Sequence, residues 1–281
     1  MKEREEKRQK QHKLQRFWNA VLAELRENKN TFIVYGLLRL LVLGVLILQI
    51  FNRNYQNVFL CLLTLVLMIV PSMIQVTFHV EIPSFFEIII LIFIFAAEIL
   101  GEISAFYIKF PYWDTVLHTL NGFLCAAVGF SLVDLMNRER RLRFELSPLF
   151  MAITAFCFSM TIGVLWEFFE FGMDQVWGLD MQKDTVIHVI GSTYLDPLKD
   201  NNCVTIRGIQ DVIINGESLG VGGYLDIGLI DTMWDMIVNF IGAFVFSVMG
   251  FFYEKRRENK GLVKELVLEP WSVEKSSGKE E

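Results

Sequence analysis

The sequence predicts an all-α integral membrane protein: six transmembrane helices in a bundle, with an extracytoplasmic β-hairpin insertion between the fifth and sixth. The first observation is where the charges lie. In this 281-residue chain they crowd into the first thirty residues, the last thirty and two loops, and apolar runs lie between them. A helix needs about 20 apolar residues to cross a bilayer. Only structures that satisfy their own backbone hydrogen bonds can do so, and this favours helices.

Six apolar runs are long enough to span a membrane. They cover residues 31–51, 57–76, 83–107, 113–135, 148–172 and 229–253. The first thirty residues are rich in charge and are not a short apolar segment with a small-residue cleavage pattern. We therefore expect no secretory signal and a first span that stays as an anchor. The expected regions are a basic helix at 1–30, a membrane domain at 31–253 with an outer insertion at about 173–228, and a charged tail at 254–281.

The basic helix at residues 1–30 is predicted from apolar residues at helical spacing, with Lys and Arg on the other face. This pattern is typical of a helix that lies on the anionic inner surface of a membrane. A cytoplasmic helix packed against the loops fits it equally well. The apolar residues are Leu14, Phe17, Trp18, Val21, Leu22 and Leu25.

The second observation is the distribution of positive charge, which sets the orientation of membrane proteins. Basic residues are frequent before the first span, between the fourth and fifth, and after the sixth. The loops on the other side offer few, such as Arg53 and Lys109. With six spans, both termini are predicted to be cytoplasmic. The basic residues after the fourth and sixth spans are Arg138, Arg140, Arg141, Arg143, Lys255, Arg256 and Arg257.

The insertion carries the third observation. Asn215-Gly216 lies between β-branched runs, which is a strong signal for a two-residue hairpin turn. Of the four cysteines, only Cys203 lies in a long loop, so we expect no disulfide there. The cysteine spacing fits no zinc motif. The net charge of -6 argues against nucleic acid as a partner.

Polar residues interrupt the apolar spans at one depth. Asp114 and His118 lie four apart at the start of the fourth span. Glu167 and Glu170 lie three apart near the end of the fifth, and a ladder of acids and an amide opens the sixth. With the predicted topology, all of these positions fall in the outer half of the membrane. We therefore expect one shared polar site. Its candidate residues are Asp114, His118, Glu167, Glu170, Asp231, Asp235 and Asn239.

Simpler explanations exist for single members of this set. Asp114 and Asp231 each stand where a helix begins, so either could be an N-cap or a first-turn acid favoured by the helix dipole. A single histidine in a span is usually a packing or hydrogen-bonding residue. These explanations do not account for polar residues at one depth on three helices.

Several carboxylates in a low-dielectric setting must take up protons, pair with a base or bind a cation. No Lys or Arg is available at this depth. Carboxylate, amide and imidazole ligands suit Mg²⁺, Mn²⁺ or Ca²⁺, and Zn²⁺ is also compatible. His118 and Glu170 are the candidate catalytic acid or base. No Walker A, G-x-S-x-G or H-E-x-x-H motif is present. The candidate metal ligands are Asp114, His118, Glu167, Asp231, Asp235 and Asn239.

Small residues in the fourth and sixth spans predict that these two helices are close neighbours, because small side chains let helix backbones approach. The fourth span offers Gly122, Ala126 and Gly129. The sixth offers Gly242, Ala243 and Ser247.

The stretches "WDTVLHTLNGF", "WEFFEF" and "YLDIGLIDTMWDMIVNFIGA" resemble the YjdF-like family of uncharacterised bacterial inner-membrane proteins. The likeness covers the third to sixth spans and is most specific in D-x₃-H-x₃-G combined with D-x₃-D-x₃-N-x₂-G. A more distant similarity links the acid-to-Asn ladder to VanZ-like proteins, which are associated with the cell envelope. The resemblance implies a bacterial cytoplasmic membrane protein whose polar residues belong together, but it implies no reaction.

Three functions fit these features. The first is binding of a cation and an outer-leaflet lipid or polyprenyl phosphate headgroup, with metal-dependent lipid chemistry left open. The second is an envelope structural or regulatory protein whose polar cluster joins helices. Its partner would bind the outer hairpin or the N-terminal helix. The third is a proton- or cation-coupled transporter, although no inverted repeat is visible.

Overall fold

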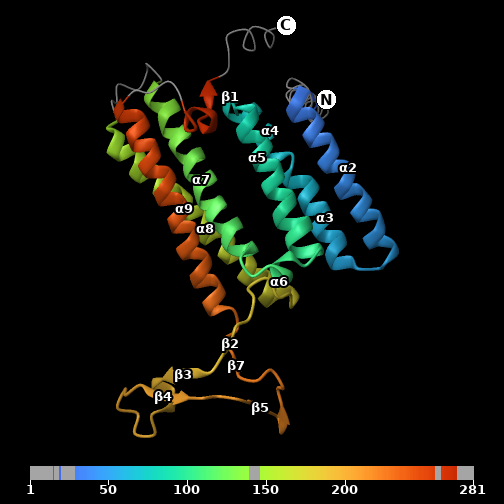
Figure 1. Cartoon of the computed structure of the whole chain (residues 1–281), viewed down its shortest axis with the longest axis vertical. Helices are drawn as coiled ribbons and strands as arrows, with labels where there is room; N and C mark the ends of the chain where they lie inside the picture. Colours follow the sequence, from blue (N-terminus) through green and yellow to red (C-terminus); the bar gives the residue numbers. More distant parts are fainter. Residues whose placement is uncertain (1–14, 16–18, 20–28, 139–145, 257–260, 271–281) are drawn as a thin grey trace, which may run out of the picture. The chain divides into compact units, whose positions relative to one another are not determined.

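A computed structural model describes residues 15, 19, 29–138, 146–256 and 261–270. All but four residues of the predicted basic helix at 1–30, and most of the predicted tail at 254–281, lie outside the described residues. The six predicted spans are confirmed, because six helices in the described part of the chain are long and apolar enough to cross a membrane (Figure 1). The helices of these spans are α2 (Lys29–Phe51), α3 (Tyr55–Leu67), α4 (Val70–Phe78), α5 (Ser84–Phe95), α7 (Trp113–Arg138), α8 (Pro148–Trp177) and α9 (Leu229–Arg256).

Two of the spans are less regular than the sequence predicts. The second is broken at Met68 and Ile69 into α3 and α4, and Pro71 lies in the first turn of α4. Proline suits a first helical turn because it has no backbone N–H to satisfy there. The third span continues from α5 as a π-helix, η1 (Ala96–Ile103). It ends before Ala105, whose φ of 57° is left-handed, and the short helix α6 (Phe106–Lys109) follows.

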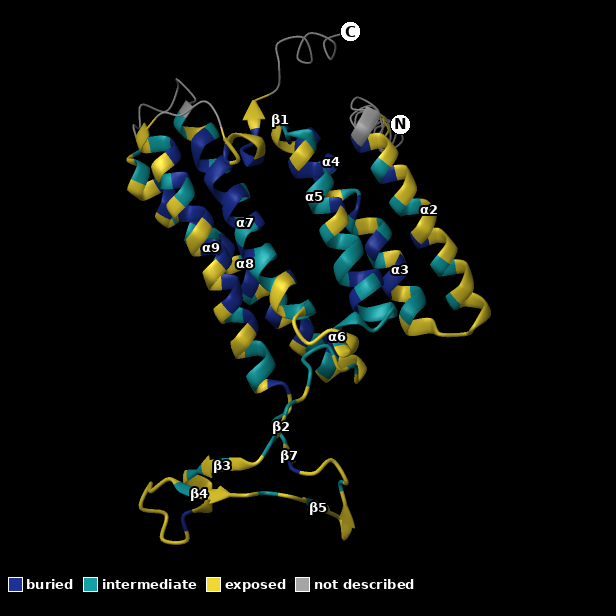
Figure 2. Cartoon of the chain, viewed as in Figure 1, coloured by how far each residue is buried: buried dark blue, intermediate teal, exposed yellow. Residues whose placement is uncertain are grey.

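The chain forms two compact units. The first unit contains Met1–Met160 and Asn239–Glu281, and the second contains Thr161–Val238. In the first unit, a core of buried side chains includes Phe86, Phe130 and Phe246. Figure 2 colours the buried stretches of the helices dark blue. The rings of Phe130 and Phe246 pack edge to face, with 6.1 Å between their centroids. A second cluster joins α2, α3 and α5 around Val42 and Leu91.

The predicted contact between the fourth and sixth spans is confirmed within the first unit. A Cβ added to Gly242 on α9 would overlap the carbonyl oxygen of Thr119 on α7. A Cβ added to Gly122 would overlap the carbonyl oxygen of Asn239 in the same way. The two glycines therefore let the helix backbones touch.

A short segment after α9 packs into the core of the first unit, and the sequence did not predict this. The turn η3 (Lys264–Leu266) is followed by β8 (Glu269–Pro270), which pairs antiparallel with β1 (Val80–Glu81). Leu266 and Leu268 are each 1% exposed. The Leu268 N–H donates to the Ser131 hydroxyl at 3.0 Å. The segment was not predicted because its apolar run is too short to span a membrane and is flanked by charged residues in the sequence.

The second unit holds the insertion, with three two-stranded antiparallel ladders instead of one hairpin. The predicted hairpin is confirmed: β5 (Ile213–Ile214) pairs with β6 (Glu217–Ser218). Its turn residues Asn215 and Gly216 have φ of 55° and 92°, as a type I′ turn requires. The other ladders are β2 (Val186–Ile187) with β7 (Tyr224–Leu225) and β3 (Val189–Ser192) with β4 (Val204–Arg207), and a 3₁₀ turn η2 (Thr193–Leu195) follows β3.

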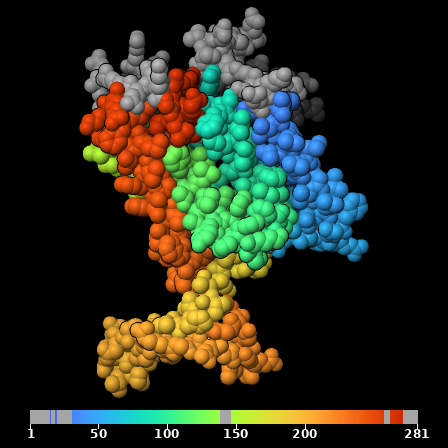
Figure 3. Space-filling model, in the orientation of Figure 1, coloured from blue at the N-terminus to red at the C-terminus, as the bar shows by residue number. Residues whose placement is uncertain are grey.

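The insertion is ordered by hydrogen bonds rather than by an apolar core. Residues 178–228 are all described, and no hydrophobic side chain among them is buried. Figure 3 shows this segment, yellow to orange, as a thin layer of side chains. It begins five residues later than the predicted 173, because α8 continues to Trp177.

Candidate functional site

Three of the predicted site residues meet in the second unit. Glu167 and Glu170 lie on α8, three residues apart and so on one face. Asp235 lies on α9, and one carboxylate oxygen from each of the three falls within 4.8 Å of the others. All three side chains are buried, with exposures of 5%, 8% and 3% for Glu167, Glu170 and Asp235. We call these three residues the carboxylate cluster.

An indole orients one member of the carboxylate cluster. Trp166 donates its Nε1–H to Oε1 of Glu170 at 2.9 Å, one helical turn away. The ring of Trp166 packs against Phe169 with 5.2 Å between centroids. Sequence analysis missed Trp166, although its i,i+4 spacing to Glu170 was a usable signal. The bond fixes the direction of the Glu170 carboxyl without adding positive charge.

Asp231 lies in the first turn of α9 but does not join the carboxylate cluster. Its Oδ2 accepts the backbone N–H of Lys183 at 2.7 Å, which ties the insertion to the helix. The capping role falls to Asp226, which the sequence analysis did not single out. Its Oδ2 accepts the N–H of Ile230 and its Oδ1 accepts that of Thr185, each at 2.7 Å.

Asp174 anchors the start of the insertion in the same manner. It accepts the N–H of Met181 at 2.7 Å and that of Gln182 at 2.9 Å. Asp174, Asp226 and Asp231 therefore bind backbone N–H groups of residues 181–185, the segment that leads into β2. This arrangement gives both ends of the insertion fixed attachment points on α8 and α9.

In the first unit, Asp114 and His118 form the predicted pair one turn apart. His118 Nε2 lies 3.4 Å from Asp114 Oδ1. The His118 side chain is 11% exposed and the Asp114 side chain is 31% exposed. Asp114 also lies in the first turn of α7, where a negative charge favours the helix dipole. The pair can hold the imidazole in one orientation.

Asn239, also in the first unit, takes part in a hydrogen-bond chain between helices. Its Oδ1 accepts from Nδ2 of Asn121 at 3.2 Å, and its own Nδ2 lies 3.6 Å from Met160 Sδ. Asn121 in turn accepts from the Cys125 thiol at 3.5 Å. Asn121 was missed from the sequence, yet an amide three residues after His118 in an apolar span was a visible signal.

The insertion carries acids in contrasting environments. Burial, and then the negative charges of Asp180, Asp226 and Asp174, raise the pKa of Asp184. The backbone N–H of Asn202, helped by those of Leu198 and Asp200, lowers the pKa of Asp196. The neighbouring acids therefore favour the neutral form of Asp184, whereas the hydrogen bonds to Asp196 favour its charged form.

The carboxylate cluster is the part of the predicted set that can hold a metal from within one unit. Carboxylate oxygens are the ligands that Mg²⁺, Ca²⁺ and Mn²⁺ prefer. Three carboxyls this close cannot all be charged at low dielectric unless a cation lies among them, and otherwise at least one of them is protonated. The donor set therefore fits a hard divalent cation.

These features define a multi-pass membrane protein with polar side chains buried within its spans. Residues 34–256 match the family described as predicted membrane protein (DUF2238), and the chain belongs to that family. This agrees with the YjdF-like resemblance of the sequence motifs. An uncharacterized protein of Thermotoga maritima is 26% identical over 98 residues, which cover 35% of this chain and 48% of that protein. The match thus spans about half the length of this curated relative. No solved structure matches the chain.

Proposed function

We propose that the protein binds a divalent cation at the carboxylate cluster and, through it, the phosphate headgroup of an outer-leaflet lipid or polyprenyl phosphate. One observation carries the proposal: Glu167, Glu170 and Asp235 are buried, come from two spans, and place carboxylate oxygens within 4.8 Å of one another. Buried carboxylates this close to one another repel strongly at low dielectric. Three such acids together favour a bound cation over three separate charges.

The identity of the ion follows from the donor atoms. The cluster offers only oxygen, which favours Mg²⁺, Mn²⁺ or Ca²⁺. Zn²⁺ more often takes Cys or His ligands. The predicted addition of Asp114 and His118 to the ligand set remains a hypothesis, and a His118→Ala variant with unchanged metal content would remove His118 from it.

The depth of the carboxylate cluster supports a headgroup ligand. Glu170 lies seven residues before the end of α8, and Asp235 six after the start of α9. At 1.5 Å per residue, both are about 10 Å from their helix ends, near the boundary between headgroups and hydrocarbon. Basic residues at the opposite helix ends, such as Arg138 and Lys255, support placing this boundary at the outer face.

If the protein is an enzyme, Glu170 has the position expected of a general acid or base, because Trp166 holds its carboxyl in place. The Asp114–His118 pair is the second candidate, since the aspartate can hold the imidazole in one orientation. A bound divalent cation would supply positive charge to a phosphate oxygen or activate a water molecule.

A structural role is the second candidate function, and the hydrogen bond between Asn121 and Asn239 favours it. Interhelical amide bonds and backbone contact at glycines are typical of polar residues that join helices. In that case the carboxylate cluster would hold protons shared between carboxyls instead of a metal.

Metal analysis of the purified full-length protein tests the proposal. The protein is extracted from membranes without chelator, and its Mg, Mn, Ca and Zn contents are measured by mass spectrometry. We expect a bound divalent metal in the wild type and its loss in Glu167→Gln and Asp235→Asn, which keep the side-chain shape. Glu217→Gln, at an exposed acid on β6, is the matched control and should keep the metal. Equal metal content in all four proteins, or none in any, would overturn the proposal.

A further inference from the structure

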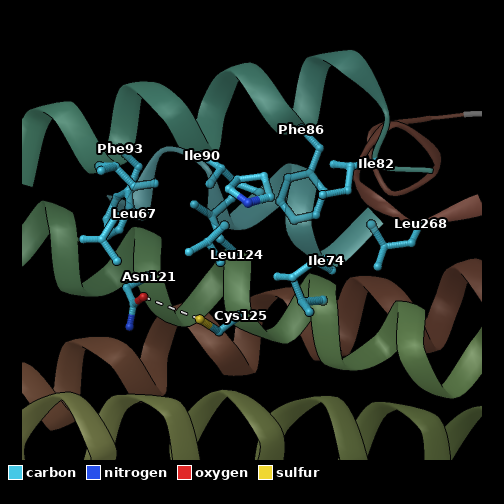
Figure 4. Close-up of a pocket in the computed structure, with 14 residues that line it drawn as sticks. Leu67, Ile74, Ile82, Phe86, Ile90, Phe93, Asn121, Leu124, Cys125 and Leu268 are labelled. Carbon is cyan, nitrogen blue, oxygen red and sulfur yellow. Dashed lines mark hydrogen bonds between the residues drawn. The ribbon is translucent and has the colours of Figure 1, made fainter. Parts of the chain in front are cut away.

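The first unit contains an apolar pocket between its second, third and fourth spans (Figure 4). Its volume is about 220 Å³. Leu67 and Pro71 line it from the second span, Phe86 and Ile90 from the third, and Leu124 from the fourth. The pocket is therefore built almost entirely from residues of membrane-spanning helices.

The break in the second span helps to form this pocket. The chain leaves α3 at Leu67 and re-enters a helix at Val70, and both residues line the pocket. On α5 and α7 the lining residues recur every three or four positions, so each helix presents one continuous apolar face. From Phe86 to Phe93 this face is about 10 Å long at 1.5 Å per residue.

Figure 4 shows Asn121 and Cys125 together at one part of the pocket wall, joined by a hydrogen bond. The Asn121 amide also donates to Asn239, so these groups already bond to one another. The C-terminal segment contributes Leu268 to the pocket wall. A ligand here meets almost only hydrocarbon.

A pocket of this kind is unsuited to water. Protein interiors are close-packed, and voids larger than a water molecule are few. Apolar cavities of about 150 Å³ stay dry and bind small hydrocarbons such as benzene. The surroundings of these spans are lipid acyl chains, which supply such a ligand at high concentration.

We propose that this pocket binds one acyl chain of a membrane phospholipid, with the remainder of the lipid in the bilayer. The acyl chain lies beside the irregular turn of the second span at Met68 and Ile69 and contacts Ile90 and Leu124. The proposal concerns residues of the first unit only and does not depend on the cation proposed above.

Photo-cross-linking in a bilayer tests this proposal. The full-length protein is reconstituted in phosphatidylcholine nanodiscs with a trace of phospholipid that carries a diazirine on one acyl chain. After illumination, adducts are mapped by peptide mass spectrometry. We expect adducts on residues 86–94 and 121–128, including Leu124, whose exposure of 5% leaves little surface for the surrounding lipid to reach. Adducts confined to exposed positions such as Leu48 and Leu62 would overturn the proposal.

A pocket-filling variant provides the second measurement. Leu124→Trp should lower the adduct yield on residues 86–94 about tenfold, the factor that corresponds to 1.4 kcal/mol of binding. Leu62→Trp, at a half-exposed position on α3, is the matched control and should leave that yield unchanged. A thermal melt confirms that each variant is folded, and Ile90→Phe replaces Leu124→Trp if the latter is not. Unchanged labelling in a folded pocket variant would contradict the proposal. Loss of labelling when an isoprenoid alcohol is added, but not when unlabelled phospholipid is added, would also contradict it. Metal content should be the same in all of these variants.

Discussion

Asn121 on α7 donates its side-chain amide to Oδ1 of Asn239 on α9 across 3.2 Å, and Asn239 is 1% exposed. A buried amide in a membrane protein is stabilised by such a partner, because an unsatisfied polar group in hydrocarbon is costly. The bond joins two spans that are 118 residues apart in the chain.

The coupling between these two asparagines can be measured with a double-mutant cycle of Asn121→Leu and Asn239→Leu. We expect a coupling free energy of about 0.6 kcal/mol, and at most about 1.7 kcal/mol, as found for hydrogen bonds between membrane helices. The measurement is reversible unfolding in detergent micelles. The control cycle pairs Asn121→Leu with Thr154→Val, a partly buried position on α8, and should be additive. Additivity in both cycles would show that the bond does not stabilise the protein.

Gly242→Ala should destabilise the first unit, because the new methyl group would overlap the Thr119 carbonyl oxygen. Overpacking of this kind costs about 1–3 kcal/mol. The matched control is Gly44→Ala on α2, where an added Cβ has no neighbour within 4 Å. Thermal unfolding of the two variants should give a lower midpoint for Gly242→Ala and no loss for Gly44→Ala. Equal midpoints would contradict the observed contact between α7 and α9.

The pKa values of two acids in the insertion should be displaced in opposite directions from the usual 3.8, that of Asp184 upward and that of Asp196 downward. Backbone N–H groups bind the Asp196 carboxylate and lower its pKa, so its contribution to loop stability is complete above 3.8 and is lost as the pH falls through the lower folded value. Burial and neighbouring acids raise the pKa of Asp184, so its protonation begins at higher pH and relieves repulsion.

Carboxyl ¹³C NMR of the full-length protein in detergent can follow both acids. The signals are assigned by their loss in Asp196→Asn and Asp184→Asn. As the pH is lowered, the Asp184 signal should shift first and the Asp196 signal last. A common midpoint for the two would show that the backbone bonds to Asp196 do not form in solution.

The predicted orientation can be tested with the insertion's own thiol. Cys203 is exposed, so a membrane-impermeant maleimide should label it in intact cells if the insertion is outside. A Lys255→Cys, Cys203→Ser variant places the accessible thiol at the opposite end of α9 and should be labelled only after permeabilisation. The reversed pattern would invert the topology inferred from the positive residues.

The spans were predictable because their signal is local: an apolar run of sufficient length has few alternatives to a membrane helix. The Asn215-Gly216 hairpin was predictable for a similar reason, since its turn requires φ > 0 at two successive residues. The break at Met68 was not, because the sequence stays apolar across it, and the π-helix after Phe95 was not, because Glu98 and Glu102 are spaced as in an ordinary α-helix. These irregularities depend on packing against neighbouring helices.

The candidate site was predictable in part. Spacing placed Glu167 and Glu170 on one helix face, and depth indicated that Asp235 would lie at a similar level. The role of Asp231 was not predictable, because its partner is the backbone N–H of Lys183, 48 residues away. A backbone donor leaves no mark in the sequence. The inclusion of Leu268 in the core depends likewise on a tertiary contact, with Ser131.

Direct observation of a metal at the carboxylate cluster is the most decisive measurement. Crystals or vitrified particles of the full-length protein are prepared with Mn²⁺ and, separately, with a chelator, and anomalous scattering or difference density is calculated. The account predicts an ion at about 2.0–2.5 Å from oxygens of Glu167, Glu170 and Asp235, absent from the chelated sample and from Asp235→Asn. Carboxyl groups bonded directly to one another in both samples, with no ion, would contradict it.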